Sequence, residues 1–395
     1  MRVLQLCKFY HPFHGGMETV VRELTEGAVR QGVKTDVLCA NTQPRTQVDL
    51  ADSGYRIVRA SSWGRLLSTS LSPSLIVQAR RMCRDVDIVH VHMPDPMAAL
   101  ALRIARPTAK IVVHWHSDIV RQKLALRVYR PLQNWLLRRA DAIVATSSAY
   151  AQSSPCLRPW QNKVVVIPIG ISDPAASPTP QPDVQRIREA YGDRKIVFSL
   201  GRMAYYKGFD VLIDAAADLR DDCVVVIGGD GELLAQLRDQ VARRGLSRKV
   251  FLVGRIPESD LGAYFRAATM FCLASTQRAE AYGVVLVEAM AMGKPVVGTD
   301  IPGAAVPWIN ISGVTGLNVP VRDARALSSA INRIAADPGL ATRLGTAARA
   351  RYEQCLGADA MVDGTLALYR RLMSAETGST ADVAVDSGPR SANPS

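Results

Sequence analysis

The sequence KIVFSLGRMAYYKGFDVLI, residues 195–213, contains the unit that the rest of the chain repeats. Its apolar run ends at Leu200, and a loop bounded by glycines leads to a helical pattern from about Gly208. A near-continuous apolar strand, rather than one that alternates with polar residues, indicates a strand that is covered on both faces. The stretch therefore predicts one strand–loop–helix step of a parallel sheet.

This step recurs on both sides of residues 195–213. Short apolar runs follow in CVVVIGG, KVFLVG, MFCLAS, PVVGTD and TGLNVP. Earlier runs, within residues 1–170, are VLQLC, KTDVLCA, DIVHVH, KIVVHWH, AIVATS and KVVVIPIG, and helical patterns separate several of them. The alternation predicts an α/β protein with two Rossmann-like, doubly wound parallel-sheet domains that face a central cleft.

A change in composition indicates where the two domains meet. Residues 172–183, SDPAASPTPQPD, are rich in Pro, Ser and Ala, as linkers often are. A chain of 395 residues exceeds the roughly 250–300 residues at which one hydrophobic core stops growing. The predicted division is a domain over 1–171, a linker over 172–184, a domain over 185–357, a last helix over 358–374 and a disordered tail over 375–395.

The excess positive charge is confined to the first part of the chain. Residues 1–170 carry 23 Lys and Arg against 11 Asp and Glu, whereas the remainder carries 25 of each, so that part accounts for the net charge of +12. We expect it to face something acidic, such as nucleic acid, an anionic membrane or a phosphorylated acceptor.

No apolar run approaches the roughly 18 residues of a membrane span, and the N-terminus does not resemble a signal peptide, so a cytoplasmic protein is expected. The seven cysteines form no CxxC pair, which favours free thiols over a disulfide framework or a zinc site.

Two cations lie in the loop after the strand that ends at Leu200. Arg202 offers a planar fork to phosphate oxygens and Lys207 offers a point charge, and a diphosphate leaving group needs such neutralisation. On spacing alone, an ordinary solvated basic loop explains the two residues equally well.

Two carboxylates flank a predicted helix start in QRAEAYGVVLVEAMAMGKPVV. Glu280 precedes the helix expected from about Gly283, and Glu288 lies in its second turn. The free N–H groups of the first turn make an anion site, and carboxylates accept hydrogen bonds from vicinal diols such as those of a sugar or a ribose. Taken alone, the pattern also fits a helix-capping acid with a surface glutamate.

Four further patterns are weaker. Gly15-Gly16 after the first strand lets a backbone approach a phosphate, although a simple turn looks the same, and GGDGE at 228–232 lacks the GxGxxG form. HxHxD at His114, His116 and Asp118 has a spacing that would put all three on one face of a strand. A metal there is disfavoured because further ligands are missing. The DxD at Asp85 and Asp87 is interpreted as a helix exit into a strand.

Taken in order, these motifs resemble those of glycosyltransferase family 4, whose members have the GT-B fold. The resemblance covers nearly the whole chain and rests on Gly15-Gly16, GRMAYYKG, GGDGE, the Glu280-to-Glu288 spacing that continues into EAMAMGKPVV, and GVTGLNVP. It implies a retaining, metal-independent hexosyltransferase that has no cofactor and takes its sugar from a nucleotide-sugar donor. It also implies that the helix over 358–374 crosses back to the N-terminal domain.

The same resemblance implies roles for individual residues. Arg202 and Lys207 would hold the diphosphate, Glu280 the sugar and Glu288 the ribose, and His116 would contact the transferred sugar. The backbone at Gly15 and Gly16, the base-packing side chain of Ile256 and the amides of Ala281, Tyr282, Gly283 and Val284 would complete the donor site.

The stretches HWHSDIVRQK and YYKGFDVLI are most similar to bacterial polysaccharide enzymes that use GDP-mannose or a GDP-deoxyhexose. The implied acceptor is a polyprenyl-diphosphate-linked saccharide at the cytoplasmic leaflet, with no nucleic acid as a partner. Arg278, in STQRAE, departs from the family, where small residues or Pro are common, and this puts the sugar specificity in doubt.

Several rival functions are open to test. A dehydrogenase should show GxGxxG after the first strand, which is missing, and a nucleic-acid binder should interleave basic residues with aromatic ones, which are only 6% of the chain. A UDP-sugar-dependent enzyme with a soluble acceptor and an epimerase of the GT-B fold are closer alternatives.

A basic and apolar segment, residues 119–140, is the candidate membrane contact. It mixes arginines with leucines and Trp135, which suits a helix lying on an anionic membrane, and Pro131 is expected to start a second helix within it. Trp63, Leu66 and Leu67 could add an apolar contact. An ordinary packed helix with a solvated basic face fits the pattern as well.

Overall fold

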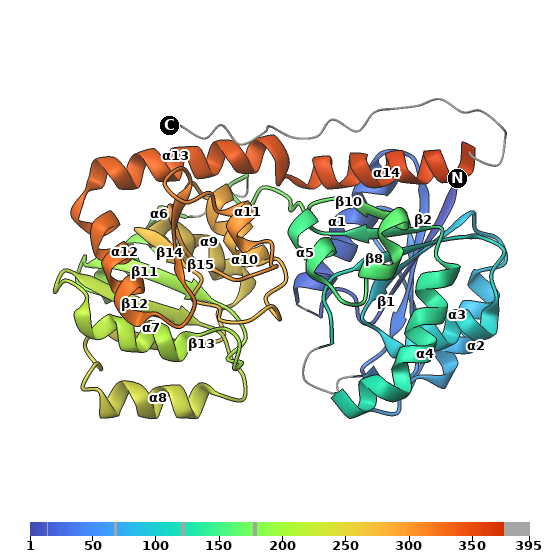
Figure 1. Ribbon diagram of the computed structural model, residues 1–395, viewed down its shortest axis with the longest axis horizontal. Coiled ribbons are helices and arrows are strands. Elements are labelled where there is room, and N and C mark those ends of the chain that lie inside the picture. The colour runs from blue at the N-terminus through green and yellow to red at the C-terminus, as the bar shows by residue number, and fades with distance from the viewer. Residues whose placement is uncertain (14, 67–68, 120–122, 177–179, 375–395) are drawn as a thin grey trace.

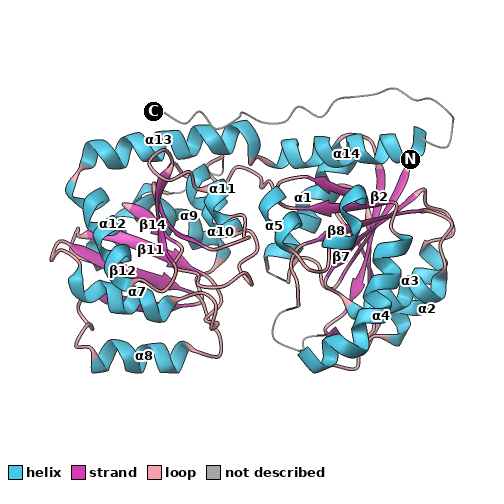
Figure 2. Ribbon diagram, viewed as in Figure 1, coloured by secondary structure: helices cyan, strands magenta, loops and turns pink. Residues whose placement is uncertain are grey.

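The computed structural model of this chain describes residues 1–13, 15–66, 69–119, 123–176 and 180–374. The tail over 375–395, predicted to be disordered, and residues 177–179 of the predicted linker lie outside the described residues. The described chain forms two α/β units side by side (Figure 1), and helices flank the sheet of each unit (Figure 2). The C-terminal sheet is entirely parallel and the N-terminal sheet is parallel apart from the edge strand β3, so the predicted fold class is confirmed.

The N-terminal sheet has the strand order β10-β9-β8-β7-β1-β2-β4-β3 and is parallel except for β3. Its central strands β1, β7 and β8 are buried apart from the first residues of β1 and β8, because helices cover both faces. Its strands are β1 (Arg2–Cys7), β2 (Lys34–Ala40), β3 (Gln47–Leu50), β4 (Arg56–Ala60), β7 (Ile88–Met93), β8 (Lys110–Trp115), β9 (Ala142–Ala145) and β10 (Val164–Val166), and β5 (Arg65–Leu66) and β6 (Thr69–Ser70) form a separate antiparallel pair. Its helices are α1 (Gly16–Arg30), α2 (Pro73–Met82), α3 (Pro96–Ala105), α4 (Lys123–Arg139), α5 (Ser148–Ser153) and the 3₁₀ helix η1 (Arg158–Lys163).

The C-terminal sheet has the order β13-β12-β11-β14-β15-β16, and all of its strands are parallel. Its strands are β11 (Lys195–Leu200), β12 (Cys223–Gly228), β13 (Val250–Gly254), β14 (Met270–Cys272), β15 (Val296–Asp300) and β16 (Gly316–Pro320). The helices of this part are α6 (Gln181–Ala190), α7 (Phe209–Ala215), η2 (Ala216–Asp218), α8 (Leu234–Arg243), α9 (Glu258–Ala267), α10 (Val284–Ala291), α11 (Val306–Ile309), α12 (Ala324–Ala336), α13 (Pro338–Cys355) and α14 (Ala358–Ser374).

The chain passes between the two units at two places that lie side by side. Ile171 pairs with Gly357 in an isolated parallel bridge, and a Cβ at Gly170 would collide with the carbonyl oxygen of Gly357, so the close approach requires a glycine. After this crossing, α14 runs along the N-terminal unit beside α1 (Figure 1), where Gln31 donates a hydrogen bond to Asp363. The last helix thereby joins the first unit.

Two local expectations differ from the structure. Pro131 lies inside α4, which continues through it, so the expectation of a second helix starting there is wrong. The remaining backbone bonds and the burial of Tyr129, Leu136 and Leu137 keep the helix intact across the one hydrogen bond that proline removes. Likewise α6 begins at Gln181, inside the range expected for the linker, because a proline in the first turn of a helix loses no intrahelical bond.

The sequence patterns do not predict strands β3 to β6. Strand β3 lies at the edge of its sheet and is mostly exposed, so it lacks the apolar run that marks the central strands. Trp63 is largely exposed in this region, and Leu67 lies outside the described residues.

Candidate active site

The strand order of each sheet reverses at one position, and the candidate residues follow the strands beside it. In the C-terminal sheet, β11 and β14 are neighbours although they are not consecutive in sequence, and in the N-terminal sheet the corresponding neighbours are β1 and β7. Ligands of open parallel sheets bind outside the carboxyl ends of strands at such switch points. Arg202 and Lys207 follow β11, Glu280 follows β14, and Gly15 and Gly16 follow β1.

A buried ion pair joins the loops after β11 and β14. Nζ of Lys207 lies 2.6 Å from Oε2 of Glu280, with side-chain exposures of only 10% and 9%. The same carboxylate oxygen accepts a hydrogen bond of 2.8 Å from Ser275. Burial disfavours the charged ammonium, but the attraction of Glu280 outweighs it and raises the pKa of Lys207. Lys207 is therefore charged at neutral pH, next to the carboxyl group of Glu280.

The backbone conformation of Gly208 allows Lys207 to lie beside Glu280. Gly208 has φ of 66°, a left-handed conformation that favours glycine, and it caps the start of α7. A Cβ there would collide with the carbonyl oxygen of Ala274, in the chain that follows β14. The helix start predicted from the sequence is confirmed, and the close approach of the two loops brings Lys207 to Glu280.

A second helix start faces the opposite unit. Gly283, with φ of 88°, caps α10, and within the described residues we find no hydrogen-bond partner for the amides of Ala281, Tyr282, Gly283 and Val284. A Cβ on Gly16 would lie 3.5 Å from Cγ2 of Val284, so the start of α1 in one unit lies against the start of α10 in the other. Two helix N-termini meeting beside Lys207 form a place for an anion.

Arg202 and Glu288 complete the polar lining. Arg202 is exposed, and its guanidinium makes a weak hydrogen bond of 3.5 Å with the hydroxyl of Tyr206. Glu288 is half-buried on α10, and its carboxyl group has no hydrogen-bond partner in the described part of the chain. Burial raises its pKa to about 7, against the opposing effect of Lys207. Ile256 is half-buried against Gly228, at the carboxyl end of β12.

His116 reaches the cleft from the N-terminal unit, at the end of a hydrogen-bonded chain. Its Nε2 lies 3.0 Å from Nδ1 of His92, and Nε2 of His92 lies 2.9 Å from Oε1 of Gln5. Because the amide oxygen of Gln5 can only accept, His92 donates there, and its Nδ1 must accept from His116. Burial lowers the pKa of His116 to about 3. His116 is thus neutral and keeps a lone pair on Nδ1, which can accept a hydrogen bond from a sugar hydroxyl.

The buried imidazoles of His90, His92 and His114 have ring nitrogens close enough together to raise the question of a metal. Their rings are stacked, with interplanar angles of 12° to 23°, and both nitrogens of His92 are already hydrogen-bonded. Lone pairs of stacked rings run side by side instead of converging on one point, as a metal requires. The arrangement favours a packed stack, in which Tyr369 of α14 hydrogen-bonds Nδ1 of His90.

The spacing of HxHxD does not place its three residues together. His114 and His116 stack on each other, but Asp118 accepts from Nε1 of Trp115 at 3.0 Å and pairs with Arg278 at 3.1 Å. Strand β8 ends at Trp115, so the alternation of a strand does not extend to Asp118. The expectation that all three share one face is wrong.

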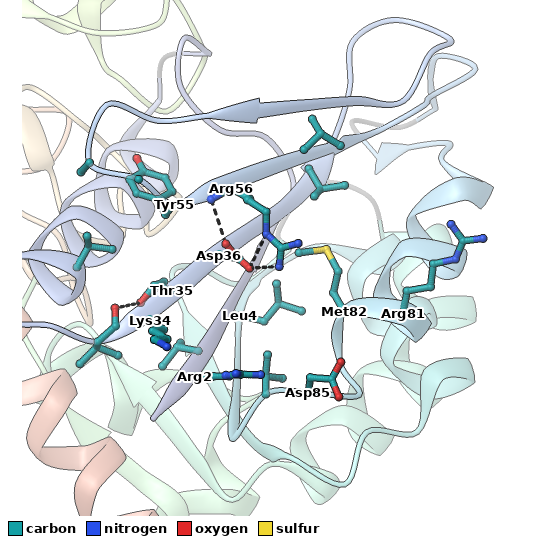
Figure 3. A pocket seen from close by; sticks show the side chains of 18 of the residues that line it. Arg2, Leu4, Lys34, Thr35, Asp36, Tyr55, Arg56, Arg81, Met82 and Asp85 are labelled. Carbon is teal, nitrogen blue, oxygen red and sulfur yellow. Dashed lines mark hydrogen bonds and ion pairs between the residues drawn. The ribbon is translucent and has the colours of Figure 1, made fainter.

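A depression of about 870 Å³ lies elsewhere on the N-terminal unit (Figure 3). It is lined by Arg2 and Lys34, the first residues of β1 and β2, by Asp36 near the start of β2, and by Asp85, before β7. These are amino ends, opposite to the edge that carries the cleft residues. Asp36 is paired with Arg56 there (Figure 3). The DxD motif therefore lies away from the candidate site, in agreement with its structural interpretation.

Comparisons with known protein families match the N-terminal and the C-terminal parts of the chain separately. Residues 14–173 match the profile of Glycosyltransferase Family 4, and residues 181–351 match that of Glycosyl transferases group 1. The chain is 34% identical to O-antigen chain mannosyltransferase C of Escherichia coli, over 95% of this chain and 100% of that protein. It is 36% identical to the D-rhamnosyltransferase WbpZ of Pseudomonas aeruginosa, over 90% and 92%.

Solved structures resemble the whole molecule. Sucrose-phosphate synthase of Thermosynechococcus elongatus has a TM-score of 0.78 at 23% identity, covering 95% of this chain and 100% of that chain. HepE of Anabaena in complex with UDP has a TM-score of 0.74 at 22% identity, covering 94% and 100%. At this level of identity the likeness concerns the fold alone.

Proposed function

This chain belongs to glycosyltransferase family 4 and has the GT-B fold, and on that premise we propose that it transfers mannose or a deoxyhexose from a GDP-sugar to a lipid-linked saccharide. The observation that carries the proposal is the Lys207–Glu280 pair, 2.6 Å long, at the meeting point of two helix N-termini. In this site, positive charge for binding a diphosphate lies beside a carboxylate for binding a sugar. The names of the E. coli and P. aeruginosa relatives support the sugar class and a role in polysaccharide synthesis.

In the proposed reaction the bond between the anomeric carbon and the diphosphate breaks, and its electron pair passes to the departing phosphate oxygen. Lys207, Arg202 and the free amides at the start of α10 stabilise the charge that develops there. The acceptor hydroxyl enters on the same face and passes its proton to that oxygen, so the anomeric configuration is retained. Because the carboxylate of Glu280 is paired with Lys207, it suits sugar binding better than a nucleophile's role.

The test is a thermal-shift comparison of GDP-mannose, a GDP-deoxyhexose, UDP-glucose and UDP-N-acetylglucosamine, followed by NMR of the product's anomeric centre. We expect stabilisation by the GDP-sugars, a retained configuration, and activity that EDTA does not remove. Stabilisation by UDP-sugars alone would replace the GDP assignment, and an inverted product would refute retention. Isomerised donor, formed without any acceptor, would identify an epimerase instead.

Glu288 gives donor binding an expected dependence on pH. Ribose hydroxyls donate to the ionised carboxylate, whose pKa is about 7 in the free protein, so the nucleotide favours the form present above pH 7. By linkage, the affinity for GDP should fall about tenfold from pH 8 to pH 6.

Calorimetric titration of GDP at pH 6, 7 and 8 measures this dependence. The Glu288→Gln variant cannot ionise there and serves as the control, because the nucleotide's own phosphate titrates equally with both proteins. If the variant keeps the full slope of the wild-type protein, Glu288 does not bind the ribose.

A membrane contact through α4 is the second part of the proposal. Arg127, Arg130 and Arg138 are exposed on this helix, and Val128 is 84% exposed between them. Leu136 and Leu137, by contrast, are buried in the core, so their expected membrane contact is wrong. No helix among the described residues is both long and apolar enough to cross a bilayer.

Liposome sedimentation tests this contact. We expect the protein to sediment with anionic vesicles at low salt and to be released at high salt, since each basic residue contributes about 1 kcal/mol near the surface. The variant Arg127/Arg130/Arg138→Glu should lose binding. Arg139 is left unchanged, because it pairs with Asp141 at 3.0 Å.

The matched control is Arg238/Arg243/Arg248→Glu, which makes the same charge change at exposed positions in the C-terminal unit. Equal binding by the two variants would show that net charge, and not α4, governs sedimentation. Failure of the wild-type protein to sediment would favour a soluble acceptor.

A further inference from the structure

Arg278 reaches across the cleft from one unit to the other. It lies in the segment between β14 and α10 of the C-terminal unit, and its Nη2 pairs with Oδ2 of Asp118, 3.1 Å away in the N-terminal unit. Its Nη1 donates to the carbonyl oxygen of Ser153 at 3.3 Å, and its guanidinium stacks 4.5 Å from the ring centre of Tyr150. All three partners belong to the N-terminal unit.

The partner carboxylate is held rigidly. The Oδ1 atom of Asp118 accepts from Nε1 of Trp115 at 3.0 Å and from the hydroxyl of Ser154 at 2.7 Å. The backbone N–H of Asp118 donates to the hydroxyl of Tyr150 at 2.6 Å. The other oxygen, Oδ2, faces Arg278, so the guanidinium binds an acceptor whose position is fixed. A planar guanidinium can hydrogen-bond this oxygen and stack on the ring of Tyr150 at the same time.

The contact extends to a second pair of segments. The hydroxyl of Ser153 donates to the carbonyl oxygen of Gly303, 3.0 Å away in the loop after β15. Asp118, Tyr150 and Ser153 on one side and Arg278 and Gly303 on the other therefore form one interdomain clasp.

Two residues of the clasp are close in sequence to the two side chains assigned to the transferred sugar. Asp118 is two residues after His116, and Arg278 is two residues before Glu280. We infer that Arg278 is a positioning residue, which through Asp118 holds His116 and Glu280 at the separation that the donor sugar requires. This inference rests on the proposed function. It assigns a role to Arg278, to which the family resemblance assigns none.

A clasp of this kind has a kinetic signature. The side chains assigned to the nucleotide, Arg202, Lys207 and Glu288, all belong to the C-terminal unit, and only the backbone at the start of α1 reaches it from the other unit. Nucleotide binding therefore depends little on the clasp. Transfer needs the closed cleft, because His116 and Glu280 come from different units. Removing the clasp should therefore lower kcat while leaving the affinity for the nucleotide unchanged, whereas damage to the fold or to the nucleotide site would alter both.

The experiment compares Arg278→Met, Asp118→Asn, the double variant and Arg278→Lys, using GDP for binding and GDP-mannose for turnover. Arg278→Met should lower kcat about 10- to 100-fold, as for a misplaced reacting group, with the Kd for GDP within twofold of wild type. The double variant should lose no more than the worse single variant, because both act through one contact. Arg278→Lys keeps the charge and should recover part of the loss. The control Arg244→Met breaks an ion pair with Asp214 inside the C-terminal unit and should change neither constant.

Small-angle scattering of the ligand-free proteins separates the clasp from the proposed function. Arg278→Met should have a larger radius of gyration than wild type, and this readout needs no donor. If the wild-type protein transfers no sugar, the proposed function fails and the scattering result still decides whether the clasp exists. Equal radii, losses that multiply in the double variant, or a Kd for GDP that rises as much as kcat falls would each overturn the inference.

Discussion

Lys207→Ala is expected to lower kcat/KM about 30- to 1,000-fold, which corresponds to roughly 2–4 kcal/mol of lost transition-state stabilisation. The ammonium is buried 2.6 Å from Glu280 and remains charged, so it is already oriented when the diphosphate departs. Water cannot replace it, because the side chain is only 10% exposed. Most of the loss should appear in kcat, since negative charge on the leaving group grows towards the transition state.

The fold must be checked alongside this loss. Removing Lys207 leaves the carboxylate of Glu280 buried without its ion pair, which should destabilise the protein by about 1–3 kcal/mol and lower its melting temperature. Lys195→Ala is the matched control, because Lys195 also pairs with a carboxylate, Asp222, at 2.8 Å, but at the amino end of β11. A Lys207→Ala protein that is folded and retains kcat/KM within threefold of wild type would exclude the diphosphate role.

Arg202→Ala is expected to produce a comparable loss in kcat/KM, about 30- to 1,000-fold, without a change in stability. The side chain is exposed and its weak bond to Tyr206 contributes little to the fold. Steady-state kinetics with the preferred nucleotide sugar, together with the melting temperature, measure the two effects separately. Arg202→Lys should retain only part of the activity, because an ammonium cannot bind two phosphate oxygens as a planar fork does.

Arg243→Ala is the matched control for Arg202, since Arg243 is an exposed arginine of the same unit, at the last residue of α8. It should behave as wild type. If Arg202→Ala and Arg243→Ala have the same kcat/KM, then Arg202 belongs to an ordinary solvated loop and Lys207 is left to neutralise the diphosphate without it.

Local patterns in the sequence were enough to predict most of the fold. The apolar runs correspond to the central strands of both sheets, and the glycines at 208 and 283 mark the starts of α7 and α10. These features depend on neighbouring residues: a buried strand needs a continuous apolar run, and a left-handed cap needs a glycine. The edge strand β3 was missed because its exposed residues carry no such signal.

The candidate site was predictable only in part. The sequence indicated that Lys207 lies in a loop after a strand and that Glu280 precedes a helix start, but only the structure shows that the two side chains lie 2.6 Å apart. Nothing in the sequence around Glu288 indicated that its pKa lies near 7, because that value results from burial inside the assembled cleft. The roles of these residues in catalysis stay predictions until the variants are measured.

By itself, the sequence determined two parallel-sheet units and the glycine-capped starts of α7 and α10, since each depends on short-range pattern and backbone sterics. Only the tertiary structure decided that Arg278 meets Asp118, that His116 is held through His92 and Gln5, and that α4 runs through Pro131. The reason is physical: Arg278 and Asp118 are 160 positions apart in the sequence, and their contact depends on how the two units pack together. The energy of that packing comes from surfaces that no local stretch of sequence contains.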